Sequence, residues 1–148
     1  MVKECILGQI VDGVMRKDEA GQVVENMWVS LPERYPDVVL DSFVVMPNHL
    51  HAIIMISVGA IHESPDTQQQ KRRTMTLSKV MGYLKMNAAK QINQLRNNPG
   101  CPVWQRDYYE RVIRDDKELN AIREYIENNP MQWNLDRNNP SNIHTPSL

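Results

Sequence analysis

The stretch VVLDSFVVMPNHLHAIIMI, residues 38–56, decides the fold prediction because it contains two apolar, β-branched runs separated by Pro47-Asn48. Runs of this composition favour strands, and a Pro-Asn pair between them favours a tight turn. The sequence therefore predicts strands at residues 38–46 and 49–56, joined as an antiparallel hairpin.

His49 and His51 lie on the same face of the second predicted strand, because side chains alternate between the two faces. Two neutral imidazoles separated by one residue can both reach one divalent cation. A bare His-x-His pair is weak evidence, however, and two surface histidines without a metal are the alternative interpretation. His62 and His144 are expected to be solvent-exposed and uninvolved. The opposite, core-facing side of the strand is expected to consist of Leu50, Ala52, Ile54 and Ile56.

Further elements are predicted on both sides of this hairpin. Residues 5–15 favour a short hairpin around Val11-Asp12-Gly13, and apolar spacing predicts helices over residues 18–33, 76–96 and 115–128. We expect a flexible loop at residues 57–74, a strand within residues 103–113 and a loosely ordered polar tail at residues 134–148. The order predicts one α+β domain, residues 1–133, with a ferredoxin-like antiparallel sheet, helices on one face and an added C-terminal helix.

The charge distribution is uneven although the net charge is only −1. Eight Lys and Arg residues and no Asp or Glu lie between Thr67 and Arg106. Such a stretch could recruit a phosphate backbone, and a solvated basic helix explains it equally well. Within the predicted helix, Lys79 and Lys90 lie opposite the apolar stripe and Lys85 lies at its border.

The cellular setting follows from absences in the sequence. Cys5 and Cys101 are the two cysteines, so no disulfide framework is indicated. The N-terminus lacks the apolar core of a signal peptide, and no apolar run is long enough to span a bilayer. We expect a cytoplasmic protein without a membrane partner.

The last predicted helix carries Tyr125 and Asn129, which lie one turn apart on the same face. A free phenol is a poor nucleophile at neutral pH, but it can attack a phosphate that a metal ion polarises. The amide oxygen of Asn129 could be a third ligand to a hard cation. An aromatic residue at the edge of the core and an Asn-Pro helix stop are the alternative interpretations.

Three segments together resemble one family. FVVMPNHLHAIIMI at residues 43–56 resembles the HUH segment of the REP-associated tyrosine transposases, relatives of the small insertion-sequence transposases. VWQRDYYERVIR at residues 103–114 and EYIENNP at residues 124–130 resemble the remaining signatures of this family, in the same order. The similarity runs from about Cys5 to Trp133, nearly the full chain.

The resemblance implies a DNA-nicking enzyme that uses Mg²⁺ or Mn²⁺. His49 and His51 would bind the metal, and Asn129 would complete its site. Tyr125 would attack a phosphodiester of single-stranded DNA and leave a 5′-phosphotyrosine link and a free 3′-hydroxyl. Substrates in this family are single strands folded into imperfect hairpins, and the covalent link allows strand transfer without ATP.

Basic and aromatic side chains could hold such a substrate. The cations of Lys79, Lys85, Lys90 and Arg106 could contact the DNA backbone. The rings of Trp104, Tyr108 and Tyr109 could stack on unpaired bases, although sheet packing is the alternative for at least one of them. Arg106 and Arg111 alternate with these aromatics, as expected for a nucleic-acid surface carried by a strand.

One departure from the family concerns the N-terminus. Family members usually begin with an aromatic-rich strand ahead of a stretch like Glu-Cys-Ile-Leu-Gly, and here that stretch comes almost at once. We expect the first strand of the ferredoxin-like sheet to be missing, or to be replaced by residues 3–11 or by a partner chain. A truncated gene and a misplaced start are further explanations, and either would affect activity.

Three other functions compete with this one. The main rival is a non-catalytic nucleic-acid-binding module, for example a truncated or decayed transposase. An HUH replication initiator or relaxase is disfavoured by the short chain and the single candidate tyrosine. A metal-dependent hydrolase lacks a convincing acid–base partner for His49 and His51. Either a monomer or a homodimer is compatible with the sequence, and Tyr125 could meet the metal of its own chain or of a partner.

Overall fold

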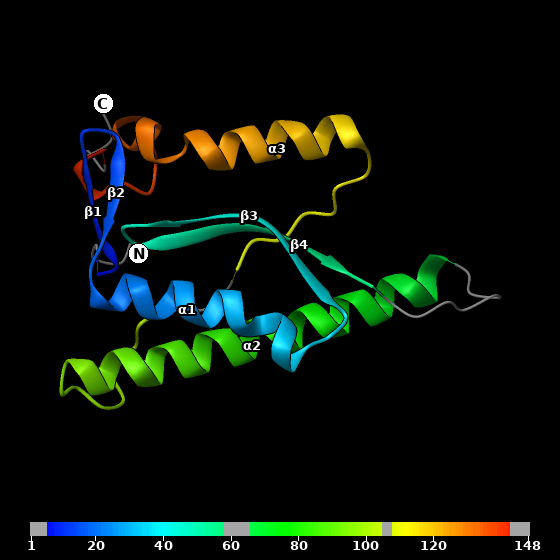
Figure 1. Cartoon of the computed structure of the whole chain (residues 1–148), viewed down its shortest axis with the longest axis horizontal. Helices are drawn as coiled ribbons and strands as arrows, with labels where there is room; N and C mark the ends of the chain where they lie inside the picture. Colours follow the sequence, from blue (N-terminus) through cyan, green and yellow to red (C-terminus); the bar gives the residue numbers. More distant parts are fainter. Residues whose placement is uncertain (1–5, 58–65, 105–107, 143–148) are drawn as a thin grey trace, which may run out of the picture. The chain divides into compact units, whose positions relative to one another are not determined.

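The structure, a computed structural model, describes residues 6–57, 66–104 and 108–142. Strands and helices both occur in these ranges, which confirms the predicted α+β class (Figure 1). Every helix there is too short or too polar to cross a membrane. The elements, in chain order, are β1 (Gly8–Val11), β2 (Val14–Lys17), α1 (Glu19–Arg34), β3 (Val38–Met46), β4 (His49–Ile56), α2 (Asp66–Leu95), α3 (Asp116–Asn128) and the short 3-10 helices η1 (Pro130–Leu135) and η2 (Pro140–Asn142).

The predicted N-terminal hairpin is confirmed. Strands β1 and β2 pair antiparallel, with Gly8 opposite Lys17 and Val11 opposite Val14. Asp12 and Gly13 form the turn at φ angles of 51° and 76°. Positive φ at both central residues is what a two-residue hairpin turn requires, and Asp-Gly tolerates it.

The predicted central hairpin is confirmed as well, since β3 pairs with β4 across Pro47-Asn48. The prediction that one side of β4 faces the core, with Leu50, Ala52, Ile54 and Ile56, is wrong. Ile53, on the histidine face by alternation, is the buried residue, whereas Ala52 is exposed and Leu50 is half-buried. A two-stranded ribbon twists strongly, so one face does not stay toward one core along its length.

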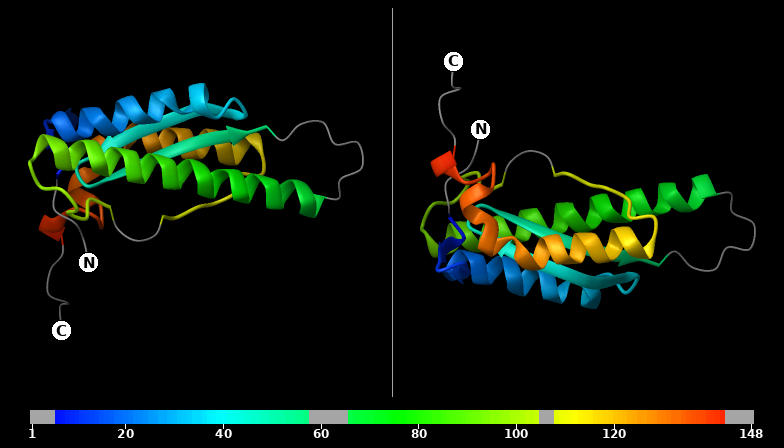
Figure 2. Two further views of the ribbon diagram at one scale, coloured as in Figure 1. Left: turned by 90° about the horizontal axis from the view of Figure 1, so that it is seen from below. Right: turned by 90° about the horizontal axis from the view of Figure 1, so that it is seen from above.

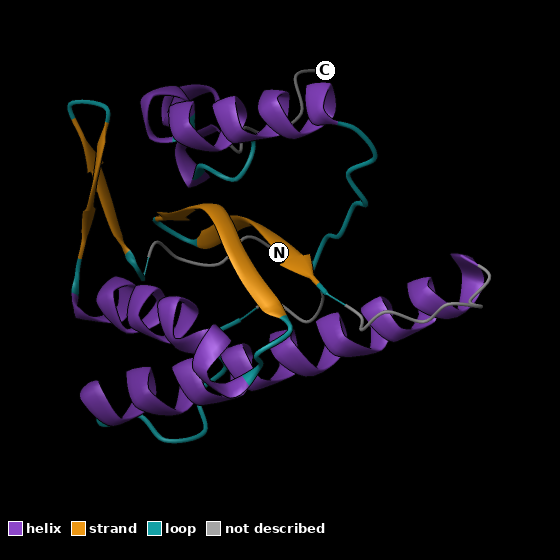
Figure 3. Cartoon of the chain, turned by 45° about the vertical axis from the view of Figure 1, so that its right-hand side comes forward, coloured by secondary structure: helices purple, strands orange, loops and turns teal. Residues whose placement is uncertain are grey.

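The described strands form two separate two-stranded sheets, the orange hairpins of Figure 3, and β1 pairs with β2 alone. Residues 8–11 therefore do not replace a missing strand beside β3 or β4. Residues 103–104 and 108–113, the described part of the strand expected there, contain no strand, and residues 105–107 lie outside the described ranges. The ferredoxin-like arrangement stays a prediction.

The chain divides into two compact units, residues 1–22, 42–52 and 104–148 in the first and residues 23–41 and 53–103 in the second. In the second unit, the buried faces of α1 and α2 form the core, and the two helices run along each other (Figure 2). Gln91 Nε2 donates to Met27 Sδ at 3.2 Å, and the rings of Tyr35 and Tyr83 meet edge to face at 5.8 Å. The buried apolar residues of these helices are Val24, Met27, Trp28, Leu31, Val80, Leu84, Ala88 and Ile92.

The first unit has a smaller core, to which β3, α3 and η1 contribute Val45, Met46, Ile126 and Trp133. Leu7 N–H donates to the Pro47 carbonyl at 2.9 Å, so the chain before β1 lies against the β3–β4 turn. Asp115 caps α3, since its side chain accepts from Glu118 N–H at 2.7 Å.

Two predicted irregular segments are shorter than expected. Helix α2 begins at Asp66, so the loop prediction is wrong for residues 66–74, where Gln, Lys and Arg favour helix. Residues 58–65 of that loop lie outside the described ranges. In residues 134–142 of the predicted tail, Asn side chains donate to main-chain carbonyls: Asn139 Nδ2 to Trp133 O at 3.0 Å, and Asn142 Nδ2 to Asn134 O at 2.6 Å.

Candidate functional site

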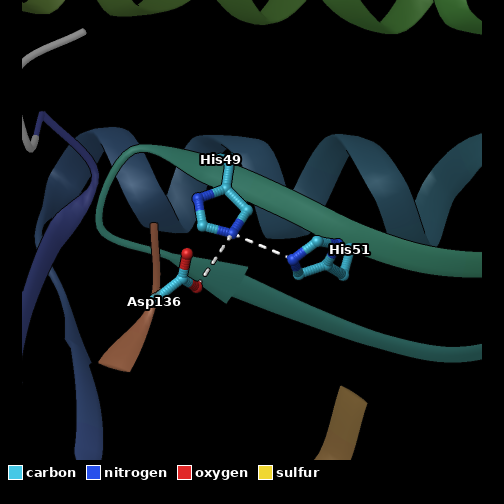
Figure 4. Close-up of side chains that lie close together, drawn as sticks. All are labelled: His49, His51 and Asp136. Atoms are coloured by element: carbon cyan, nitrogen blue, oxygen red, sulfur yellow. Dashed lines mark hydrogen bonds and ion pairs between the residues drawn. The ribbon is translucent and has the colours of Figure 1, made fainter. Parts of the chain in front are cut away.

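His49 and His51 at the start of β4 point the same way, as the strand alternation predicts. Their Nε2 atoms lie 3.0 Å apart, and their rings meet edge to face with centroids 4.6 Å apart (Figure 4). Two ring nitrogens at this distance share one proton or direct their lone pairs at one cation. The expected pair of potential metal ligands is therefore present in the geometry.

The side chain of Asn48 orients the first imidazole. Its Oδ1 lies 2.7 Å from His49 Nδ1, and its Nδ2 donates to the Asn138 carbonyl at 2.8 Å. Because Nδ2 is committed to a carbonyl, Oδ1 must accept from His49 Nδ1–H. This hydrogen bond fixes the tautomer of the neutral ring and leaves the Nε2 lone pair free.

Asp136, directly after η1, is the acidic residue that faces the two imidazoles (Figure 4). Its Oδ2 lies 4.0 Å from His49 Nε2, and one ligand atom from each of the three residues lies within 4.8 Å of the others. Sequence reasoning assigned this residue to the tail and missed it. One signal was available: Asp136 is the only acidic residue after Glu127.

Burial keeps both imidazoles neutral. Loss of water around His49, and to a smaller extent the neighbouring His51, lowers the pKa of His49 to about 4, although Asp136 opposes this shift. Burial also lowers the pKa of His51, again against the effect of Asp136. Neutral imidazole is the form that binds a metal, so protons would not compete with a cation at neutral pH.

Tyr125 on α3 lies beside the second histidine of the same chain. The rings of His51 and Tyr125 meet edge to face, with centroids 5.6 Å apart and an angle of 70°. About half of the tyrosine surface, 52%, is exposed, so a large substrate can approach it. Trp133 of η1 lies near His49 with ring centroids 6.2 Å apart. The structure therefore brings together His49, His51 and Tyr125 of the predicted set.

Asn129, the predicted third ligand, is buried at the end of α3 with 3% of its surface exposed. Its Nδ2 donates to the Tyr125 carbonyl at 3.3 Å, and its Oδ1 is buried without a hydrogen-bond partner. A buried amide oxygen without a donor is costly unless a cation or water satisfies it. Two imidazoles and a carboxylate form a donor set that fits a divalent cation such as Mg²⁺ or Mn²⁺.

The predicted DNA-contacting residues are divided between the two units. Lys79 and Lys90 are exposed on α2 and Lys85 is half-buried there, as the helical pattern predicts. Tyr109 is almost fully exposed at 97% and Tyr108 is 38% exposed, whereas Trp104 is half-buried. Arg111 pairs with Glu118 at 2.6 Å. Arg106, His62 and His144 lie outside the described residues.

A protein of Haemophilus influenzae, described as uncharacterized, is 37% identical to this chain over 142 residues. The aligned region covers 91% of this chain and 78% of that protein. No family model and no solved structure matches the chain. The comparisons thus show that the two proteins belong to one family.

Proposed function

This chain belongs to the same protein family as the Haemophilus influenzae protein, and we propose that it is a metal-dependent nuclease and transposase of the HUH, single-tyrosine type. It would nick single-stranded DNA that forms hairpins and transfer the strand through a 5′-phosphotyrosine intermediate. The observation that carries this proposal is the contact of Tyr125 with His51, whose Nε2 lies 3.0 Å from that of His49.

The nicking step needs a nucleophile and a stabilised phosphate. His49 and His51 would hold Mg²⁺ or Mn²⁺, which supplies positive charge to a non-bridging phosphate oxygen when bound. Tyr125 Oη attacks the phosphorus, so that an Oη–P bond forms and the P–O3′ bond breaks. The phenolic proton leaves to solvent, which the half-exposed side chain contacts, and the departing O3′ takes up a proton.

Strand transfer follows because the phosphodiester energy is conserved in the new bond. An attacking 3′-hydroxyl displaces Tyr125 Oη from the phosphorus and restores a P–O3′ bond, and the phenol regains a proton. Neither direction consumes ATP, because one ester bond replaces another.

Contacts with DNA are assigned to aromatic and basic side chains. Tyr108 and Tyr109 are available to unpaired bases, and stacking contributes about 1–3 kcal/mol per base. Lys79, Lys85, Lys90 and Arg106 would neutralise backbone phosphates. Trp104 and Arg111 are weaker candidates, since Trp104 is half-buried and the Arg111 guanidinium already pairs with Glu118.

The proposal includes a ferredoxin-like arrangement around β3 and β4. Because those strands form a sheet of two strands in the described part of the chain, we propose that a strand of a partner chain extends it. A homodimer is the simplest source of such a strand.

The test uses the full chain, Mn²⁺ and a labelled library of single strands that carry imperfect hairpins with randomised stems and flanks. We expect a protein–DNA adduct that survives denaturing electrophoresis. Tyr125→Phe should abolish the adduct and preserve DNA binding, whereas Tyr83→Phe, a control at a tyrosine of α2 that packs against Tyr35, should retain the adduct. DNA binding by the wild type without any adduct would favour the non-catalytic module instead.

A further inference from the structure

We propose that Asp136 is the carboxylate ligand of the cation held by His49 and His51, so that the segment after η1 is part of the metal centre. The inference rests on the proposed function only where that function assigns a cation to the two imidazoles. It adds an anionic ligand that the resemblance, which points to Asn129, does not supply.

The distances suit one shared ion. His49 Nε2 lies 3.0 Å from His51 Nε2 and 4.0 Å from Asp136 Oδ2. Ligand atoms that are each about 2.1 Å from an octahedral cation lie about 3 Å apart when adjacent and about 4 Å apart when opposite. These two separations are of the size that a common ion imposes, and one ligand atom from each of the three residues lies within 4.8 Å of the others.

The carboxylate of Asp136 is held in place by its own segment. Its Oδ1 accepts from Asn138 N–H at 2.7 Å, which leaves Oδ2 turned toward the imidazoles. The Asp136 backbone N–H donates to the Trp133 carbonyl at 3.0 Å, and Asn142 Nδ2 donates to the Asp136 carbonyl at 3.0 Å. A ligand fixed in this way loses little conformational entropy when it binds a metal.

Among the described residues, this carboxylate has the Asn138 N–H as a donor and the His49 imidazole as its ion-pair neighbour. The Asp136 side chain is only 10% exposed, and the imidazole lies at 4.0 Å. A neutral imidazole and one backbone N–H do not neutralise a carboxylate, and a mostly buried charge is better stabilised beside a counter-ion. A divalent cation between the three groups would remove this cost.

Asn48 links the strand ligands to the tail ligand. Its Oδ1 accepts from His49 Nδ1–H, and its Nδ2 donates to the carbonyl of Asn138, the residue whose N–H holds Asp136. One side chain thus orients His49 and anchors the turn that presents the carboxylate. Hydrogen bonds of this kind around metal ligands set ligand orientation.

The test measures Mn²⁺ binding by the full chain without DNA, from the electron paramagnetic resonance signal of free Mn²⁺. Asp136→Asn keeps an oxygen to accept from Asn138 N–H and removes the charge, so the fold of the tail is preserved. We expect Mn²⁺ affinity to fall at least about tenfold. Asp116→Asn, at an exposed acid in the first turn of α3, should leave it unchanged.

Unchanged Mn²⁺ affinity in Asp136→Asn, or no Mn²⁺ binding by the wild type, would overturn the proposal. If Asp136→Asn loses its cooperative unfolding transition, the Mn²⁺ affinities of Asp136→Glu and Asp136→Ala are compared in its place. Because Asp136→Glu keeps the charge, we expect it to bind Mn²⁺ more tightly than Asp136→Ala. Wild-type adduct formation with unchanged Mn²⁺ affinity in Asp136→Asn would refute this inference alone. Asp136-dependent Mn²⁺ binding without any adduct would refute the proposed function alone.

Discussion

The ring of Tyr125 lies edge-on to the ring of His51 within one chain, with centroids 5.6 Å apart. Both residues belong to the same compact unit, although β4 and α3 are far apart in sequence. The candidate nucleophile and the candidate metal ligands therefore come from one polypeptide.

The first prediction concerns this arrangement within one chain. A mixture of Tyr125→Phe and His49→Ala chains should form no more DNA adduct than the separate variants, because neither chain has a complete site. The measurement is denaturing electrophoresis of labelled hairpin DNA after mixing and partial unfolding and refolding of the two variants. Recovery of a substantial share of wild-type adduct would instead mean that tyrosines are exchanged between chains.

The second prediction concerns the pH dependence of stability in the metal-free protein. The pKa of His49 is about 4 in the folded state and 6.5 as the reference for the unfolded chain. Between these values the unfolded state binds a proton that the folded state excludes, so the free energy of unfolding should fall as the pH is lowered from 7 toward 4. The contribution of His49 is at most about 3 kcal/mol.

Denaturant unfolding at several pH values, in the presence of a chelator, measures this effect. His49→Gln retains a polar side chain next to Asn48 and has no group that titrates in this range. Its stability should depend less steeply on pH than that of the wild type. Parallel curves for the two proteins between pH 7 and pH 4 would contradict the assigned cause.

The third prediction concerns Asn48 as a positioning residue. Asn48→Ala removes the acceptor for His49 Nδ1–H and the donor to the Asn138 carbonyl, and Mn²⁺ affinity should fall about tenfold. Asn48→Asp keeps an oxygen to accept from His49 Nδ1–H and loses the donor to the Asn138 carbonyl, so it should retain most of the wild-type Mn²⁺ affinity. A purely structural role would give the opposite pattern, with unfolding temperature changed in both variants and Mn²⁺ affinity changed in neither.

The fourth prediction concerns the basic face of α2. Lys79→Glu and Lys90→Glu should weaken binding of single-stranded DNA and reduce the slope of log affinity against log salt by about 1 for each lost phosphate contact. Lys117→Glu, which changes the charge equally on α3, should leave the slope near that of the wild type. If all three variants give the same slope, α2 does not contact the DNA backbone.

Several local features could be predicted from sequence because they depend on neighbours along the chain. Strand alternation placed His49 and His51 on one face, Asp12-Gly13 made a hairpin turn, and Asp115 capped α3. Helix α2 begins at Asp66, before the predicted start at residue 76, because Gln, Lys and Arg also favour helix. The buried face of β4 was predicted wrongly, since alternation does not reveal how a two-stranded ribbon twists.

The sequence by itself determined the paired imidazoles and the helix that carries Tyr125, because both follow from the repeat of a strand or a helix. Only the tertiary structure decided that Asp136 faces those imidazoles and that Asn48 reaches Asn138, 90 positions further along the chain. Such contacts depend on how segments that are distant in the sequence pack against one another. No periodic pattern encodes them, because a single side chain at the end of a turn carries the interaction.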